Sequence, residues 1–230
     1  DRPCFIIAEM SANHNQSYDL AVKTVEAAQE AGADAIKFQT YTPDTITIDS
    51  DQEYFKINHG TIWDGKTLYE LYKEAYMPWE WQPKLKLIAE SLGLVCFSSP
   101  FDHTAVDFLE KMNVPAYKIA SPEITDIPLI KYVASKGKPV IISTGIATLN
   151  DISEAIKACK EVGNHQIAIL KCTSSYPAPI EEANLNTLPD IVIRDHPFYW
   201  LNYHKQYIRS PHFHLAELNI LHIPKVSLGI

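Results

Sequence analysis

Six apolar segments of this 230-residue chain each end in charged or hydroxyl side chains. Ammonium groups and hydroxyls can bind phosphate and carboxylate, and a carboxylate beside them can orient a substrate hydroxyl or move a proton. Burying an unpaired ammonium group among apolar residues costs free energy, and a bound anion offsets that cost. The lysines therefore predict an anionic ligand. The six ends are Glu9, Lys37 with Gln39, Ser98 with Ser99, Lys118 with Ser121, Ser143 with Thr144, and Lys171 with Thr173.

Structural roles are the alternative interpretation of the same residues. Each lysine can form an ion pair with Glu9, Glu123 or an aspartate. Structural ion pairs shift pKa values just as active sites do, so a buried lysine does not by itself indicate a binding site. Each serine or threonine can cap the helix that follows its strand, because hydroxyls are preferred at N-caps. The sequence favours anion binding for the lysines as a set and capping for any single hydroxyl.

Histidines are the obvious candidates for metal binding. His14 lies in a compact polar segment, residues 13–15, but a metal site needs several ligands and no partner for His14 can be placed. The spacing of the histidines near the end of the chain fits no standard ligand pattern. The metal ligands are therefore left unassigned. These late histidines are His196, His204, His212, His214 and His222.

Strand-like and helix-like segments alternate from residue 4 to about residue 190. Strands are predicted at 4–9, 35–39, 94–97, 114–117, 139–142 and 167–170. A first helix ends at Gly32, and further helices are predicted at 79–92, 105–112, 129–134 and 149–162. A left-handed residue followed by a short apolar run is the expected junction from a helix into a parallel strand. The pattern predicts an α/β fold, a TIM-type (β/α)8 barrel, whose strand carboxyl ends form the active site. The junction residues are Gly32, Gly93, Asn113, Gly137 and Gly163.

Two segments depart from this alternation. Residues 41–76 are rich in aromatic side chains and predict an ordered functional loop with a short helix at 67–76. Residues 192–230 show no helix with the earlier caps and no clean strand with a polar end. We therefore expect a barrel domain over residues 1–191 and an atypical tail over residues 192–230 whose elements the sequence does not assign. A barrel that is incomplete at its C-terminal end is one interpretation of this pattern.

Composition excludes several classes of protein. The formal net charge of -8 argues against a nucleic-acid or anionic-membrane surface, because phosphates attract a basic face. The apolar stretches are too short for a membrane span, and no signal peptide is readable. Four cysteines without a CxxC pair fit reduced thiols in the cytoplasm, and neither a dinucleotide nor a P-loop motif is present.

Read with their neighbours, the strand ends resemble the sialic acid synthase family, whose members condense phosphoenolpyruvate with an amino sugar. Within the family, residues 41–47, 63–69 and 78–81 are most similar to the pseudaminic acid synthases. The stretches that carry the family resemblance are residues 6–9 with 13–15, then 31–40, 97–102, 117–121, 138–145 and 172–177.

The resemblance implies an eight-stranded barrel that joins phosphoenolpyruvate to 2,4-diacetamido-2,4,6-trideoxy-altrose and releases pseudaminic acid and phosphate. It implies a divalent metal, Mn²⁺ or Mg²⁺, that polarises the sugar aldehyde, and a homodimer. It assigns catalytic roles to Glu9, Lys37 and Lys118. It places Ser99, Ser121 and Ser143 around phosphoenolpyruvate, and Gln39, Glu123 and Tyr176 toward the sugar.

The chain departs from the family pattern in places. Ser99 stands where some relatives use threonine, and Ser174 where some use asparagine. The Ser-Asp-His and Glu-Lys-His motifs that hold the family's metal have no counterpart after residue 190, and neither has the C-terminal antifreeze-like domain. The alternatives are an N-acetylneuraminate or legionaminate synthase, or a truncated, non-catalytic barrel fragment.

Overall fold

Six parallel strands form the centre of the computed structural model. The structure describes residues 5–58, 63–174, 179–184 and 186, together with the backbone of 200–202, 204–210 and 213–221. Each of the six strands pairs in parallel with the next along the chain. They are β1 (Phe5–Glu9), β2 (Ala35–Thr40), β3 (Val95–Pro100), β4 (Tyr117–Ile119), β5 (Val140–Ser143) and β6 (Ile167–Lys171).

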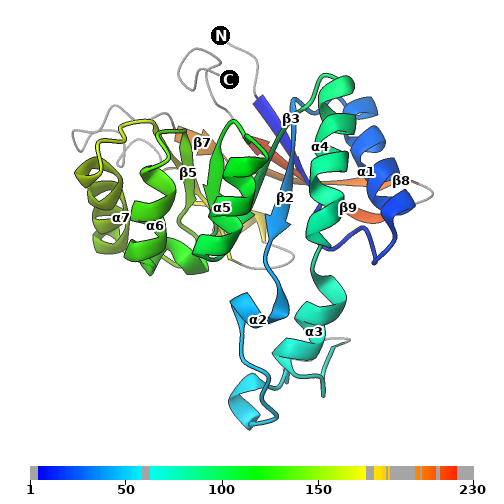
Figure 1. Ribbon diagram of the computed structural model, residues 1–230, viewed down its shortest axis with the longest axis horizontal. Coiled ribbons are helices and arrows are strands. Elements are labelled where there is room, and N and C mark those ends of the chain that lie inside the picture. The colour runs from blue at the N-terminus through cyan, green and yellow to red at the C-terminus, as the bar shows by residue number, and fades with distance from the viewer. Residues whose placement is uncertain are drawn as a thin grey trace.

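Five main helices connect these strands and lie in a row along the sheet (Figure 1). The predicted junctions are confirmed, because Asn113 and the four predicted glycines all have positive φ. Side chains of Ser17, Asp102, Asp126 and Thr148 accept hydrogen bonds from the first turns of α1, α5, α6 and α7. The helices are α1 (Tyr18–Glu30), α4 (Gln82–Ser91), α5 (His103–Lys111), α6 (Ile127–Ala134) and α7 (Leu149–Glu161).

Two predicted boundaries were wrong for local reasons. The helix predicted at 79–92 begins as a 3₁₀ turn, η2 (Trp79–Trp81), before α4 continues. The strand predicted at 114–117 instead runs from Tyr117 to Ile119, and Tyr117 N–H donates to the Pro139 carbonyl at 2.9 Å. Pro115 has no N–H to donate, so strand pairing begins only after it.

The aromatic segment after β2 leaves the body of the protein at the carboxyl end of that strand (Figure 1). It contains α2 (Pro43–Ile46), the 3₁₀ turn η1 (Glu53–Phe55) and α3 (Leu68–Ala75). The predicted helix at 67–76 is confirmed, with Thr67 as its N-cap in a capping box. Further 3₁₀ turns are η3 (Pro122–Thr125) after β4 and η4 (Ile180–Ala183) after β6.

The described backbone of the tail also forms strands. β7 (Trp200–Asn202) pairs in parallel with β6, β9 (Phe213–Leu221) pairs antiparallel with β1, and β8 (His204–Ser210) pairs antiparallel with β9. The order across the sheet is β7-β6-β5-β4-β3-β2-β1-β9-β8. A complete (β/α)8 barrel would have a parallel strand beside β1. The expected TIM-type architecture, incomplete at the C-terminal end, is confirmed.

The core lies between the sheet and the helices. Ile119, Ile130 and Ile142 are fully buried in one cluster. Ile36 and Phe38 of β2 and Leu85 of α4 are buried in a second cluster, to which α1 also contributes. Close packing of this kind fixes the strand positions. None of the helices in the described part of the chain combines the length and apolarity needed to cross a bilayer.

Candidate active site

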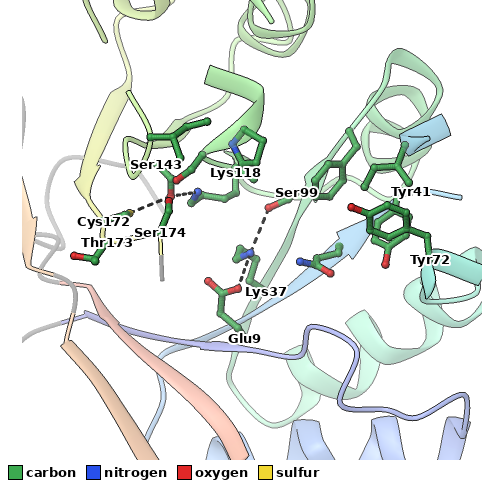
Figure 2. A pocket seen from close by; sticks show the side chains of 17 residues that line it. Glu9, Lys37, Tyr41, Tyr72, Ser99, Lys118, Ser143, Cys172, Thr173 and Ser174 are labelled. Carbon is green, nitrogen blue, oxygen red and sulfur yellow. Dashed lines mark hydrogen bonds and ion pairs between the residues drawn. The ribbon is translucent and has the colours of Figure 1, made fainter. Parts of the chain in front are cut away.

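A cavity of about 470 Å³ opens where the parallel strands end. Side chains from the ends of β1 to β6 and from the segment after β2 surround it (Figure 2). This is the position at which a (β/α) barrel builds its active site. The lining residues are Glu9, Lys37, Gln39, Tyr41, Ile46, Tyr72, Ser99, Phe101, Lys118, Ala120, Ser121, Pro122, Ser143, Ile146, Cys172, Thr173 and Ser174.

Lys37 and Glu9 form an ion pair on the cavity floor. The two residues are register partners in β1 and β2, and Lys37 Nζ lies 2.9 Å from Glu9 Oε2. The same Nζ donates to Ser99 Oγ at 3.3 Å. Lys37 is buried, so the carboxylate and the hydroxyl compensate its charge in a poorly solvated place. The ion-pair interpretation therefore holds for Lys37, although its ammonium still faces the cavity.

Lys118 is also buried but lacks this compensation. Its side chain is buried, and its Nζ donates to the Ile119 carbonyl at 2.7 Å and to Ser143 Oγ. Within the described residues, no carboxylate lies at ion-pair distance from it. Burial, followed by the charge of Lys37, lowers the pKa of Lys118 to about 8. An anionic ligand would relieve this penalty.

Serine hydroxyls complete this end of the cavity. Gly145 N–H donates to Ser121 Oγ at 3.0 Å, and Cys172 Sγ lies 3.3 Å from Ser143 Oγ. The chain is tightly packed there, because a Cβ on Gly145 would lie 2.1 Å from Ser174 Oγ. We call the residues of this side the anion end: Lys37, Ser99, Lys118, Ser121, Ser143 and Ser174.

The hydroxyls at the strand ends are not helix caps, although capping was the favoured interpretation of any single one. Asp102 caps α5 and Thr148 caps α7, in place of Ser99 and Ser143. The Ser121 side chain makes no capping bond to η3. These hydroxyls are therefore available to the cavity.

Aromatic side chains form the opposite side of the cavity. Tyr41 packs edge-on against Tyr72 and against Phe101, with ring centroids 5.6 Å and 5.4 Å apart. Figure 2 shows Tyr41 and Tyr72 across the cavity from Ser143 and Cys172. We call Tyr41, Tyr72 and Phe101 the aromatic wall. The sequence marked the aromatic segment as functional but did not assign these residues to the site.

Several predicted residues lie elsewhere. Ser98 faces away from the cavity, because neighbouring strand residues alternate in direction, and it bonds Thr40 Oγ1 at 2.7 Å. Thr144 donates to the Leu170 carbonyl at 2.7 Å. Lys171 does not join the other two lysines, since its Nζ donates to the Cys172 carbonyl at 2.9 Å.

Two of the expected sugar-facing residues are not placed in the cavity lining. Glu123 is half-buried beside it, and its Oε2 has no hydrogen-bond partner among the described residues. Burial raises the pKa of this carboxyl. Tyr176 lies outside the described residues.

His14 is buried as part of the loop that follows β1. Its Nδ1 accepts from Gln16 N–H at 3.2 Å, and its ring meets Trp81 edge-on. Burial lowers its pKa. Across the part of the chain that the structure describes, no three His, Cys, Asp or Glu side chains gather as a metal site. The described residues therefore do not supply the ligand set that the family's metal needs.

Comparison with known proteins identifies the family. The model of the NeuB family matches residues 24–196. The chain belongs to the NeuB family. This membership agrees with the resemblance seen in the strand-end motifs.

The NeuB-family relatives include two named pseudaminic acid synthase. The chain is 49% identical to the one from Helicobacter pylori over 184 residues, which cover 80% of the chain and 54% of the relative. It is 44% identical to the one from Campylobacter jejuni over 209 residues, 87% of the chain and 61% of the relative. An N,N'-diacetyllegionaminic acid synthase from Legionella pneumophila is 38% identical, over 80% of the chain and 53% of that relative.

A solved structure agrees with the fold of this NeuB-family chain. The N-acetylneuraminic acid synthetase of Leptospira borgpetersenii, in complex with citrate, superposes with a TM-score of 0.74 at 29% identity. The match covers 86% of the chain and 64% of that structure. The chain spans about half to three fifths of the length of the curated relatives described above.

Proposed function

We propose that this chain is the barrel part of a pseudaminic acid synthase, which condenses phosphoenolpyruvate with 2,4-diacetamido-2,4,6-trideoxy-altrose. The anion end carries the proposal, because a buried, poorly compensated Lys118 lies in the same cavity as Lys37 and four serine hydroxyls. Phosphoenolpyruvate offers the phosphate and carboxylate that such a site attracts. The identities of 49% and 44% to proteins named pseudaminic acid synthase favour this sugar over the legionaminate precursor.

In the proposed reaction the lysines hold charge and are not nucleophiles. C3 of phosphoenolpyruvate forms the new bond to the aldehyde carbon of the sugar, and the aldehyde oxygen takes up a proton. Water adds at C2 and loses a proton. The C2–O bond to phosphate then breaks, and the proton of the new C2 hydroxyl passes to the leaving phosphate, which leaves the keto acid and hydrogen phosphate. Lys37, Lys118 and the serines stabilise the charges of the phosphate and carboxylate throughout.

Glu9 has the position of a proton-handling or orienting group. Its carboxylate is fixed by Lys37 at 2.9 Å and lines the cavity beside the anion end. A carboxylate held there can accept a proton from the attacking water or orient a sugar hydroxyl. Gln39, also in the lining, and Glu123, beside the cavity wall, are proposed to contact the sugar.

The metal requirement of the family stays a prediction. Because the described residues bring no suitable ligand set together, we derive no step of the reaction through a metal. Dialysis against a chelator should abolish turnover, and Mn²⁺ or Mg²⁺ should restore it.

A homodimer also stays an expectation. A cytoplasmic location is supported by the three free cysteines that the structure describes.

Phosphate release from phosphoenolpyruvate tests the proposal directly. The purified chain is assayed with Mn²⁺ and a panel of sugars: the diacetamido-altrose, the legionaminate precursor and N-acetylmannosamine. Release with the altrose sugar supports the proposal, and Lys118→Met should remove it. Turnover with N-acetylmannosamine but not with the altrose sugar would reject this choice of substrate. No release with any sugar, and no manganese binding, would favour the non-catalytic fragment.

A further inference from the structure

The aromatic wall has no role in the reaction described so far. We propose that it is a subsite for an acetamido group, and that it binds the 4-acetamido group of the acceptor sugar. The inference deepens the proposed function, since it names the part of the substrate that distinguishes diacetamido sugars from sugars with a 4-hydroxyl. It makes Tyr72 a specificity-determining residue.

The direction of the cavity supports this placement. Lys118 and Ser143 are at one side, Lys37 and Ser99 are between, and Tyr41 and Tyr72 are at the other side (Figure 2). The sugar reacts through C1, which must meet phosphoenolpyruvate at the anion end. Its more distant carbons, including C4, therefore extend away from the lysines and toward the aromatic wall.

The chemistry of the aromatic wall matches an acetamido group. The rings of Tyr41, Tyr72 and Phe101 offer apolar surface to a methyl group. Burial raises the pKa of both tyrosines, so their hydroxyls remain protonated donors at neutral pH. Neither hydroxyl bonds another residue within the described ranges. A tyrosine O–H can therefore donate to the acetamido carbonyl while a ring packs on its methyl group.

The aromatic wall stands on well-anchored elements. The Gln16 side chain donates to the Glu74 and Tyr76 carbonyls at the end of α3, and Thr67 caps its start. Tyr69 donates to Asp44 at 2.9 Å and so connects α3 to α2. Fixed side chains discriminate between ligands better than mobile ones, because little ordering is needed on binding.

Binding of a matched pair of unreactive sugars tests the inference. The probes are 2,4-diacetamido-2,4,6-trideoxy-altritol and its 4-hydroxy counterpart, 2-acetamido-2,6-dideoxy-altritol, which lack the aldehyde and cannot react. Calorimetry with phosphoenolpyruvate present measures both dissociation constants. We expect the wild-type chain to bind the diacetamido alditol at least about tenfold more tightly.

Variants of Tyr72 separate its ring from its hydroxyl. The preference is the ratio of the two dissociation constants. Tyr72→Phe keeps the ring and should lower this ratio about threefold, whereas Tyr72→Ala should reduce it to near one. Tyr54→Ala is the matched control, because Tyr54 is 93% exposed on the same segment and lies outside the cavity lining. Tyr72→Phe fills nearly the same space, and melting curves confirm that each variant is folded.

The outcomes distinguish this inference from the proposed function. Equal affinities in the wild-type chain, a preference that survives Tyr72→Ala, or no binding of either alditol would overturn the aromatic-wall assignment. Phosphate release with diacetamido-altrose would still support the synthase in those cases. A Tyr72-dependent preference without any phosphate release would support the subsite and reject the activity.

Discussion

Replacing Lys118 with methionine should stabilise the ligand-free protein while removing its affinity for phosphoenolpyruvate. Burial and the charge of Lys37 lower the pKa of Lys118 from 10.5 to about 8. At about 1.4 kcal/mol per pKa unit, the folded state is destabilised by roughly 3 kcal/mol when this lysine is charged. Methionine fills similar volume without a charge, and buried charges can often be replaced this way with a gain in stability.

The expected gain is smaller than the full penalty. Lys118→Met removes the hydrogen bonds to the Ile119 carbonyl and to Ser143 Oγ, and the carbonyl left without this donor costs about 1–2 kcal/mol. The free energy of unfolding should therefore rise by about 1–2 kcal/mol at pH 7, which corresponds to roughly 2–8 °C in melting temperature for a chain of this size.

The pH dependence gives the effect a distinct signature. Below the folded-state pKa of about 8, Lys118 is protonated in both the folded and the unfolded wild-type chain. The destabilisation caused by burying its charge is then fully present. Between about pH 8 and 10.5 the unfolded chain holds a proton that the folded chain has released, so wild-type stability rises with pH. The stability gap between Lys118→Met and wild type should therefore be largest at pH 7 and shrink toward pH 10.

Differential scanning calorimetry at pH 7, 8.5 and 10, with and without phosphoenolpyruvate, measures these effects. Phosphoenolpyruvate should raise the melting temperature of the wild type but not of Lys118→Met. Lys23→Met, at an exposed position on α1, is the control and should change stability by less than about 0.5 kcal/mol. A variant less stable than wild type at pH 7, or a gap independent of pH, would refute the reasoning about Lys118.

Three further substitutions or treatments test the rest of the site. Gly145→Ala should weaken phosphoenolpyruvate binding about tenfold, because its Cβ would lie 2.1 Å from Ser174 Oγ and 3.0 Å from Ser121 Oγ; an unchanged Kd in a folded variant would contradict the steric explanation. Glu9→Gln should lower kcat by roughly a hundredfold without raising KM for phosphoenolpyruvate, since it removes a negative charge beside Lys37. A raised KM with unchanged kcat would instead make Glu9 a structural partner. Chelation should stop phosphate release, and activity that persists in a metal-free preparation would reject the predicted metal dependence.

Much of the architecture could be read from local patterns. The left-handed junction residues specify where helices end and strands follow, because that preference depends on a few neighbouring residues. The strand-end position of Lys37 and Lys118 placed them at one cavity before any contact was known. Parallel strands bring their carboxyl ends to the same side of the sheet, so sequence order alone was enough.

Other parts of the site depended on packing between distant segments. The strand pattern alone could not choose between Ser98 and Ser99, and only the family resemblance selected Ser99. Strand residues alternate in direction, so the face of the sheet that the helices cover decides which serine points into the cavity. The sequence could not place Tyr72 in the cavity either. That position requires Gln16 to hold the end of α3 and Tyr41 to pack against the Tyr72 ring.

Residue types at local spacing were enough to predict the alternating α/β architecture, the family and the cationic chemistry of the strand ends. The tertiary structure decided which charge stays poorly compensated, since Glu9 pairs with Lys37 and leaves Lys118 to neutral partners. It also decided that Lys171 turns to a neighbouring carbonyl and that an aromatic wall faces the lysines. These outcomes depend on strand register and side-chain packing across the whole fold, which no local pattern specifies.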